Sequence, residues 1–196
     1  MPAIYTPRLV LIPATVDTLR AELEGSSALA RALGVEVPED WPPELYDENA
    51  TRWMLGELER TPAFAHWGMS YIAERVPEEE SANRVIGAGG LKGPPGPDGF
   101  VEIGYSILPA FRRQGFAREA VDGWLAWAFA HDRVERVIAH TLVDLAPSIA
   151  VLQSAGFTSA GSAGDPDEPT AVRFEITRAE YDASRMARSP ARFGAA

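Results

Sequence analysis

Six stretches of the chain combine β-branched and aromatic residues with the apolar pattern of β-strands. In the first of them, Leu9 and Leu11 share one face, as the two-residue period of a strand requires. The predicted strands cover residues 6–13, 66–76, 84–91, 101–108, 136–143 and 171–177. Residues 93–99 read GPPGPDG, which only a turn or loop accommodates, so the strands on either side of it form a hairpin.

Four other stretches carry the signals of α-helices, and they cover residues 15–23, 44–60, 117–130 and 147–155. Thr15 is a typical N-cap, and Gly25 is a stop signal after the first helix. The helix over 117–130 has an apolar stripe at helical spacing, formed by Ala117, Ala120, Val121, Trp124, Leu125 and Ala128. In the helix over 44–60, the side chains expected to be buried are Leu45, Trp53, Leu55 and Leu58.

The order of these elements indicates the fold class. Helices come first, followed by a strand meander, a strand–helix–strand unit, a short helix and a last strand. This order predicts a mixed α/β (α+β) sheet with helices packed on it. The link between residues 112 and 136 is long enough for a crossover between two parallel strands. We expect one domain over residues 1–183 and a flexible tail over residues 184–196.

Composition narrows the class of protein. With 196 residues, the chain is long enough for one substantial domain and too short for two. It has no cysteine, which excludes a disulfide framework, a thiolate metal site and a cysteine nucleophile. Residues 1–10 lack the apolar core of a signal peptide, and no stretch has the roughly 18 apolar residues of a membrane helix. We therefore expect a cytoplasmic protein that has no membrane partner.

The charge is negative and unevenly distributed. The chain has a net charge of −10, and residues 1–80 hold 15 acidic and 6 basic side chains, a net of −9. An acidic first half argues against nucleic acid as a partner. It favours a cationic partner such as an amine, although acidic residues that serve only solubility explain it equally well.

A short basic segment between a predicted strand and a predicted helix carries the candidate chemistry. It consists of Arg112, Arg113, Gln114, Gly115, Phe116 and Ala117. A helix N-terminus offers unpaired N–H groups and the positive end of the helix dipole, which suits a phosphate. Gly115 lets the backbone approach an anion closely, and the two arginines add charged donors. The segment lacks the G-x-x-x-x-G-K-[ST] pattern of a mononucleotide site, so the expected ligand is a pyrophosphate on a larger molecule.

A second glycine-rich segment resembles a dinucleotide fingerprint without its context. Gly87, Gly89 and Gly93 lie in the sequence GAGGLKG. A true fingerprint opens a helix, whereas these glycines lead into the turn at residues 93–99. We interpret them as part of a strand.

The pattern R-x-x-G-x-A at residues 112–117 resembles motif A of the GNAT acetyltransferase superfamily, whose loop amides hold the pyrophosphate of CoA. SIAVLQSAGF at residues 148–157 is similar to a later helix of the same family. TPRLVLIP and EIGYSILPAFRRQGFAREA resemble the RimJ/RimL-like branch, which acetylates the N-termini of ribosomal proteins. The resemblance implies a GNAT-like, mostly antiparallel sheet flanked by helices, with a splayed strand pair at the CoA site.

The resemblance also implies an activity. Acetyl-CoA would donate its acetyl group to a primary amine by direct attack, with no metal, and the protein could form a homodimer. Glu102, which shares a strand face with Gly104 and Ser106, is the candidate base. The backbone of Ile107 and Leu108 would bind the pantetheine arm. Ser148 is the candidate partner of the thiolate, and its alternative role is a helix N-cap.

Two positions depart from the family pattern. Leu145 stands where the branch often has an asparagine, and Leu152 stands where many relatives have a tyrosine that acts as general acid. Two alternatives to an enzyme therefore stay open. One is a CoA-binding protein without catalysis that acts as a regulator or interaction module, and the other is a protein with this fold and no CoA site.

The remaining aromatic residues and histidines carry weaker signals. Core packing is the first expectation for Tyr105, with a place in the acceptor site as the alternative. We expect either a place in the lining of the acceptor pocket or a packing role in the core or at the surface for Trp41, Trp53 and Trp67. A structural or surface role is expected for His66, His131 and His140, because their spacing does not match a metal site.

Overall fold

The computed structural model describes residues 1–76, 81–162 and 170–188. Eight strands form one sheet in the order β1-β2-β3-β4-β5-β6-β8-β7. Neighbouring strands are antiparallel except for β5 and β6, which are parallel and joined through a helix. The strands are β1 (Ile4–Tyr5), β2 (Leu9–Pro13), β3 (Met69–Val76), β4 (Ser81–Leu91), β5 (Phe100–Ile107), β6 (Arg136–Leu142), β7 (Thr158–Ser162) and β8 (Ala171–Thr177). The predicted mixed, mostly antiparallel sheet is confirmed.

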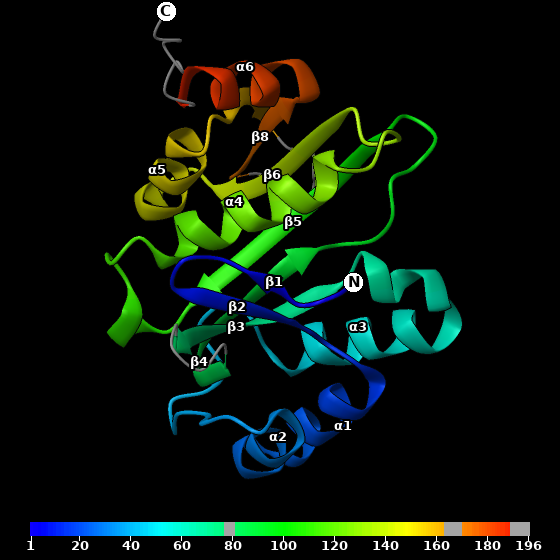
Figure 1. The fold of residues 1–196 in the computed structure, drawn as a ribbon, viewed down its shortest axis with the longest axis vertical. Helices are drawn as coiled ribbons and strands as arrows, with labels where there is room; N and C mark the ends of the chain where they lie inside the picture. Colours follow the sequence, from blue (N-terminus) through cyan, green and yellow to red (C-terminus); the bar gives the residue numbers. More distant parts are fainter. Residues whose placement is uncertain (77–80, 163–169, 189–196) are drawn as a thin grey trace, which may run out of the picture.

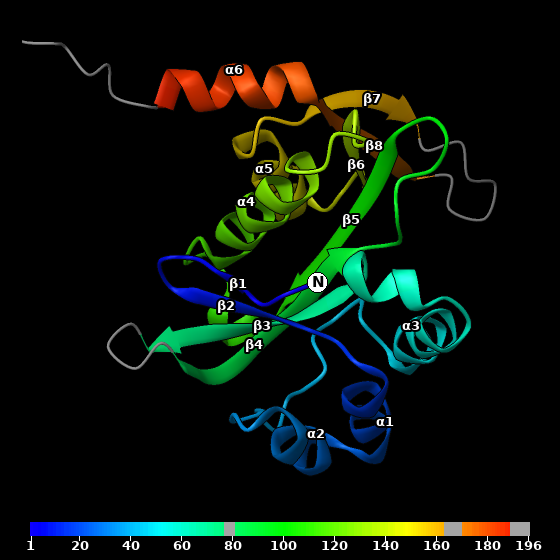
Figure 2. The same cartoon turned by 45° about the vertical axis from the view of Figure 1, so that its right-hand side comes forward.

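Helices cover both faces of the sheet (Figures 1 and 2). They are α1 (Val16–Glu24), α2 (Ser26–Leu33), α3 (Glu48–Arg60), α4 (Phe116–Phe129), α5 (Ala146–Ser154) and α6 (Arg178–Arg188), with 3-10 turns η1 (Pro62–His66) and η2 (Pro109–Phe111). One buried cluster joins the sheet to α4, α5 and α6, with Trp124 fully buried at its centre. A second cluster joins the opposite face to α1, α2 and α3, with Tyr71 fully buried. The sheet therefore separates two layers of helices.

Local signals placed most helix starts correctly. The Thr15 hydroxyl accepts a hydrogen bond from the Thr18 amide, and the Thr18 hydroxyl accepts one from the Thr15 amide, so a capping box starts α1. The prediction for the helix over 44–60 was wrong at its start, because Asp47 caps the Ala50 amide and α3 begins at Glu48. Leu45 therefore precedes the helix.

Two of the side chains expected to be buried in this region are exposed. Leu45 is 80% exposed and Trp53 is 47% exposed, whereas Leu58 is buried as expected. Leu45 has a positive φ of 63°, which turns the chain just before α3. Both side chains line an open cleft. They were predicted to be buried because the helical period shows which residues share a face but not whether another element covers that face.

Several elements were missed by sequence reasoning. Residues 66–68, which were predicted to start a strand, belong to η1 and the turn after it. No prediction was made for α2, β1, β7 or α6. Residues 184–188, which were assigned to the tail, continue α6, and residues 189–196 lie outside the described residues. A charged turn was expected over residues 77–82, but residues 81 and 82 already belong to β4, and residues 77–80 lie outside the described ranges.

The glycines of β4 serve close packing. A Cβ atom at Gly87 would lie 2.4 Å from the Ser106 carbonyl oxygen, and one at Gly89 would lie 2.6 Å from the Trp124 ring. Real Cβ atoms do not approach so closely, so these positions require glycine. Both residues lie within strand β4, which confirms that this segment is not the start of a helix.

Strands β5 and β6 separate partway along their length. They pair in parallel from Phe100 opposite Arg136 to Ile103 opposite Ala139. Beyond that point β5 continues to Ile107 and pairs only with β4. The β6 strand continues beside β8 instead. The predicted splayed strand pair is therefore present, and it opens next to the N-terminus of α4.

Candidate functional site

The loop before α4 is shaped to bind an anion. Gly115 is the N-cap of α4, with a φ of 82°, and no side chain caps the helix. Arg113 also has a positive φ, of 62°. The first amides of a helix have no intrahelical acceptor, and alternating left-handed residues turn successive N–H groups to one side. The predicted strand–loop–helix setting of this segment is confirmed, with its amides available to a ligand.

The two arginines of the loop have different surroundings. Arg112 Nε donates to the Ile107 carbonyl (2.8 Å), and its terminal nitrogen donates to the Glu44 carboxylate (2.8 Å). Arg112 therefore fastens the loop to the end of β5 and to the segment before α3. Arg113 is exposed to solvent. Its side chain is the one placed to meet an incoming anion.

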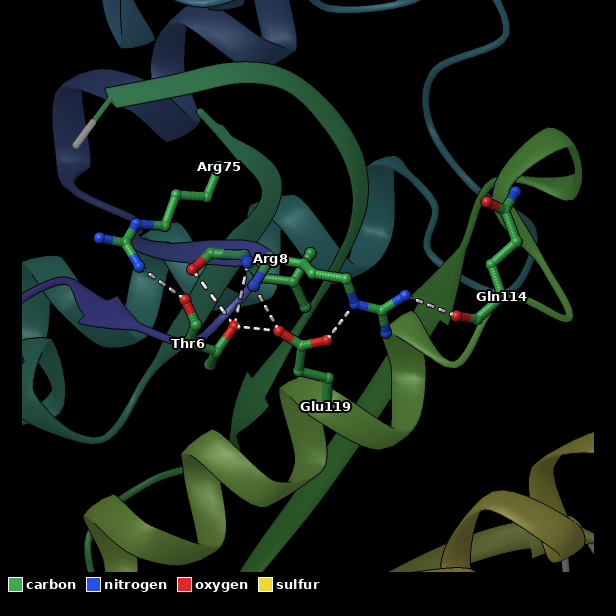
Figure 3. A network of polar contacts seen from close by, with 6 residues as sticks. Thr6, Arg8, Arg75, Gln114 and Glu119 are labelled. Atoms are coloured by element: carbon green, nitrogen blue, oxygen red, sulfur yellow. Dashed lines mark hydrogen bonds and ion pairs between the residues drawn. The ribbon is translucent and has the colours of Figure 1, made fainter. Parts of the chain in front are cut away.

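A residue that sequence reasoning did not select braces this loop from the opposite side. Arg8 Nε donates to Glu119 Oε2 (2.7 Å), and a terminal nitrogen of Arg8 donates to the Gln114 carbonyl (2.9 Å), as Figure 3 shows. The guanidinium also lies over the Phe116 ring, 4.6 Å from its centroid. Arg8 thus connects the start of β2 to the loop and to the first turn of α4.

The carboxylate of Glu119 is the centre of this network. Its Oε1 accepts hydrogen bonds from the Thr6 hydroxyl (2.6 Å) and the Arg8 amide (2.8 Å). Burial alone would raise the pKa of Glu119, but the bonds from Thr6 and Arg8 together hold the pKa below its usual value. Glu119 therefore stays ionised and keeps its hold on Arg8 at neutral pH.

The hydrogen-bond phase of β5 determines which backbone groups face the opening. The Lys92 amide bonds the Glu102 carbonyl, and the Leu108 amide bonds the Ile86 carbonyl, so even-numbered residues of β5 bond toward β4. The backbone groups of Tyr105 and Ile107 consequently point toward the opening beside β6. Tyr105 was not selected for this position from the sequence.

The backbone of Leu108 is already used within the protein. Its amide donates to the Ile86 carbonyl (2.9 Å), and its carbonyl accepts from the Phe111 amide (2.9 Å). The expectation that Leu108 offers backbone groups to a ligand is corrected accordingly. Ile107 keeps its amide for the opening, while its carbonyl accepts from Arg112.

Glu102 lies within a polar cluster that only the fold assembles. One oxygen of Glu102, Oε1, contacts Lys92 Nζ at 2.5 Å and His140 Nδ1 at 3.2 Å. Lys92 follows β4, Glu102 lies on β5 and His140 lies on β6. The cluster is therefore built from three adjacent strands of the sheet. His140 was expected to be structural or at the surface. The alternation of β6 places His140 on the same face as Ile138, and the pairing of Ile138 with Glu102 makes this the face of Glu102.

Ser148 lies on the other side of the sheet. Its helix α5 is capped at Leu145, so Ser148 is the third helical residue and not an N-cap. The Tyr105 hydroxyl donates to the Ser148 carbonyl (3.2 Å) and lies 3.4 Å from the Ser148 hydroxyl. Burial raises the pKa of Tyr105, so its hydroxyl stays protonated at neutral pH. Tyr105 also packs against the core, as expected.

A cleft of about 530 Å³ opens on the α3 face, and His140 and Lys92 lie along it. Its other lining residues are Leu45, Tyr46, Ala50, Trp53, Met54, Met69, Ala88, Gly89, Gly90, Leu91, Gly104, Tyr105 and Ser106. This size suits a small ligand or the end of a chain. A hollow of about 510 Å³ lies beside Arg8, but its Glu119 and Asp122 already form ion pairs within the protein. The cleft is therefore the better candidate site.

The other aromatic residues and histidines are distributed among different roles. Trp53 lines the cleft, whereas Trp41 and Trp67 are buried in the two core clusters. His131 packs against the ring of Trp67 at 4.7 Å. His66 lies 3.2 Å from the N-terminal amine. Within residues 1–76, 81–162 and 170–188, no group of three or more His, Asp or Glu residues could hold a metal, and no helix is long and apolar enough to cross a membrane.

Comparison with known proteins agrees with this geometry. The model of the GNAT acetyltransferase domain matches residues 8–158. The uncharacterized N-acetyltransferase YjdG of Bacillus subtilis (strain 168) is 26% identical over 159 residues, which are 80% of this chain and 90% of YjdG.

Solved structures share the fold at low sequence identity. A protein assigned as a ribosomal-protein-serine acetyltransferase from Vibrio cholerae superposes with a TM-score of 0.60 at 17% identity, covering 89% of this chain and 97% of that one. The microcin C7 self-immunity acetyltransferase MccE, solved with acetyl-CoA and AMP, superposes with a TM-score of 0.58 at 11% identity, covering 90% and 97%. Since the family model spans most of the chain, including the splayed strands and the loop before α4, the chain belongs to the GNAT acetyltransferase family.

Proposed function

We propose that this protein transfers the acetyl group of acetyl-CoA to the nitrogen of a primary amine. Membership of the family supports acetyl transfer from acetyl-CoA. The observation that carries the proposal is the uncapped start of α4 at Gly115, directly beside the opening between β5 and β6. Similarity to YjdG, which is named as an N-acetyltransferase, supports a nitrogen as the acceptor atom.

The residues of the loop would bind the pyrophosphate of CoA. The amides of Gln114, Gly115, Phe116 and Ala117 supply donors at the positive end of the helix dipole. Arg113 adds a mobile charge, and Arg112 holds the loop in place through Ile107. The backbone groups of Tyr105 and Ile107 that face the opening would bond the amides of the pantetheine arm, as an added strand does.

The acceptor amine would lose its proton to the Glu102–His140 pair. His140 lies along the cleft, and its Nδ1 is 3.2 Å from Glu102. With Nδ1–H donated to the carboxylate, Nε2 is left as the acceptor on the cleft side. Nε2 of His140 would therefore accept the proton, and Glu102 would fix the tautomer of His140 by accepting a hydrogen bond from its Nδ1–H. The neutral amine nitrogen then forms a C–N bond with the acetyl carbonyl carbon, the C–S bond breaks, and the nitrogen gives its remaining excess proton to water.

The sulfur that leaves would be protonated from the α5 side. The hydroxyl of Tyr105 lies beside the hydroxyl of Ser148 and stays protonated at neutral pH. Ser148 would pass a proton to the thiolate and recover one from Tyr105. This arrangement would replace the family tyrosine at the position of Leu152, because the Tyr105 hydroxyl comes from β5 and contacts the same helix.

Release of free thiol from acetyl-CoA tests the activity. The purified protein is incubated with acetyl-CoA and panels of amino acids, peptides, polyamines and aminoglycosides. We expect amine-dependent thiol release and an acetylated product by mass spectrometry. Absence of turnover with every panel would contradict the proposal.

Calorimetry of CoA binding tests the loop. Gly115→Val should weaken CoA binding by about a hundredfold, because a β-branched residue is strained at a φ of 82° and crowds the amides. Gly34→Val is a matched control, since Gly34 has a φ of 70° and lies at the end of α2, away from the loop. Equal affinity in both variants would show that the loop is not the CoA site.

A CoA-binding protein without catalysis is the second candidate function. The contact between Lys92 and Glu102 favours it, because Oε1 of this carboxylate is already engaged by Lys92 and His140 within the protein. Tight CoA binding with no turnover, in both wild type and Lys92→Met, would select this candidate. Turnover that Lys92→Met leaves intact or increases would exclude it.

A further inference from the structure

The acceptor cleft is apolar along most of its wall. Leu45 and Trp53 form its exposed rim, and Met54, Met69 and Leu91 are buried at its base. The backbone of Gly89, Gly90 and Gly104 supplies the remaining floor without side chains. An occupant therefore meets mainly carbon atoms of side chains and an edge of backbone.

The charge of the cleft differs from the charge of the chain. The residues that line it include no Asp or Glu, although the first 80 residues have a net charge of −9. Lys92 is the one Lys or Arg among these residues, and Glu102, which lies behind it, is already shared between Lys92 and His140. A second positive charge on an acceptor would lie near Lys92, and none of the lining residues supplies a carboxylate to replace its water.

The segment before α3 closes one end of the cleft. The Ser106 hydroxyl donates to the Glu44 carbonyl, and Arg112 bonds the Glu44 carboxylate. These two contacts hold Leu45 across from β5, so the apolar rim is fixed in position. The cleft is therefore a formed pocket for a compact apolar group.

We propose that the preferred acceptor is a monoamine whose nitrogen is joined by a short linker to a compact apolar group, such as an aromatic ring. This inference rests on the proposed function, because it assigns the cleft to the acceptor. The amine nitrogen lies at His140, and the apolar group lies against Trp53 and Met54. Polyamines and aminoglycosides are rejected because their further charges stay unpaired there.

Paired substrates test the preference. With acetyl-CoA in excess, kcat/KM for 2-phenylethylamine should exceed that for spermidine and for kanamycin by about tenfold or more. A peptide that begins with Phe is compared with one that begins with Ser, which distinguishes a free amine from a peptide N-terminus as the source of the same group. Faster transfer to spermidine, kanamycin or the Ser peptide would overturn the inference.

A negative charge introduced on the cleft wall should reduce the preference for 2-phenylethylamine over spermidine. Trp53→Glu is expected to lower kcat/KM for 2-phenylethylamine by about tenfold and to raise it for spermidine. Leu45→Glu gives the same comparison at a side chain that is 80% exposed and so tolerates the change. Met186→Glu on α6, which is 79% exposed, adds the same charge outside the cleft and should leave the preference unchanged.

Binding without transfer separates the two proposals. Calorimetry measures 2-phenylethylamine and spermidine binding to protein saturated with CoA, which carries no acetyl group. Tighter binding of the aromatic amine without any turnover would support the cleft assignment and contradict the proposed function. Turnover that prefers polyamines would support the function and overturn this inference. Absence of aromatic-amine binding to the CoA complex would also overturn it.

Discussion

At the scale of single residues, the site depends on which side chains the sheet places next to one another. Glu102 was selected from the sequence because it is a carboxylate on the strand before the loop. His140 has no sequence signal of its own, since it lies 38 positions later in the numbering. Parallel pairing of Glu102 with Ile138 brings His140, two residues further along the same face, to the same carboxylate. The pair is a property of strand register.

Substitution of His140 tests this pair. His140→Gln should lower kcat by about a hundredfold, because the positioned base is lost, while KM for acetyl-CoA stays within about twofold. Glu102→Gln should lower kcat in the same direction and add little when combined with His140→Gln. His66→Gln is the control, since His66 contacts only the N-terminal region. Steady-state kinetics that show additive losses would contradict a single functional unit.

At the scale of elements, the loop before α4 is positioned by a strand from the start of the chain. Arg8 on the approach to β2 bonds Glu119 in the first turn of α4 and the carbonyl of Gln114 in the loop. Residues more than 100 positions apart therefore fix the shape of this loop, the proposed CoA site (Figure 3). The loop motif supplies the amides, and the N-terminal segment supplies their orientation.

Removal of Arg8 should affect acetyl-CoA binding more than the chemical step. We expect Arg8→Ala to raise KM for acetyl-CoA and Kd for CoA by about tenfold while kcat changes less than about twofold. The loop loses three contacts, with Glu119, Gln114 and the Phe116 ring. Arg20→Ala is the matched control, because Arg20 forms an exposed ion pair with Glu59 on other helices. An unchanged KM would show that the loop holds its shape without Arg8.

At the scale of the whole molecule, a buried carboxylate connects the helical layer under the cleft to the sheet. Glu22 on α1 accepts hydrogen bonds from Trp41 (2.8 Å), Tyr46 (3.0 Å) and Tyr71 (2.9 Å). Burial raises the pKa of Glu22 above its ordinary value of 4.5, and the three hydrogen bonds oppose this shift only in part. Tyr46 also lines the cleft, so this cluster supports its wall.

The raised pKa predicts a pH dependence of stability. The folded protein binds the proton of Glu22 more tightly than the unfolded chain, so this contribution to stability is fully present below pH 4.5. It is lost as the pH rises through the raised folded pKa. Urea denaturation of wild type and Glu22→Gln between pH 4.5 and 8 should show wild type losing stability relative to the variant as the pH rises. A difference that stays constant or grows in the opposite direction would contradict the assignment.

Local signals in the sequence predicted those parts of the fold that depend on near neighbours. The Thr15 cap, the apolar stripe of α4 and the Pro-Gly turn at 93–99 each act within a few residues. Short elements were missed where such signals conflict. Gly25 ends α1 but also starts α2, so a stop signal concealed a second helix. Trp53 and Leu45 fit a helical period and still face a cleft, because periodicity does not reveal what lies opposite.

The sequence by itself determined the strand, loop and helix around Gly115, since the conformational freedom of glycine, the N-terminal amides of a helix and nearby arginines are local properties. It also indicated the family and Glu102. Only the tertiary structure decided that His140 contacts Glu102, that Arg8 holds the loop and that the cleft is apolar. Each of these depends on strand register or on packing between segments far apart in the chain, and neither is encoded in the spacing of nearby residues.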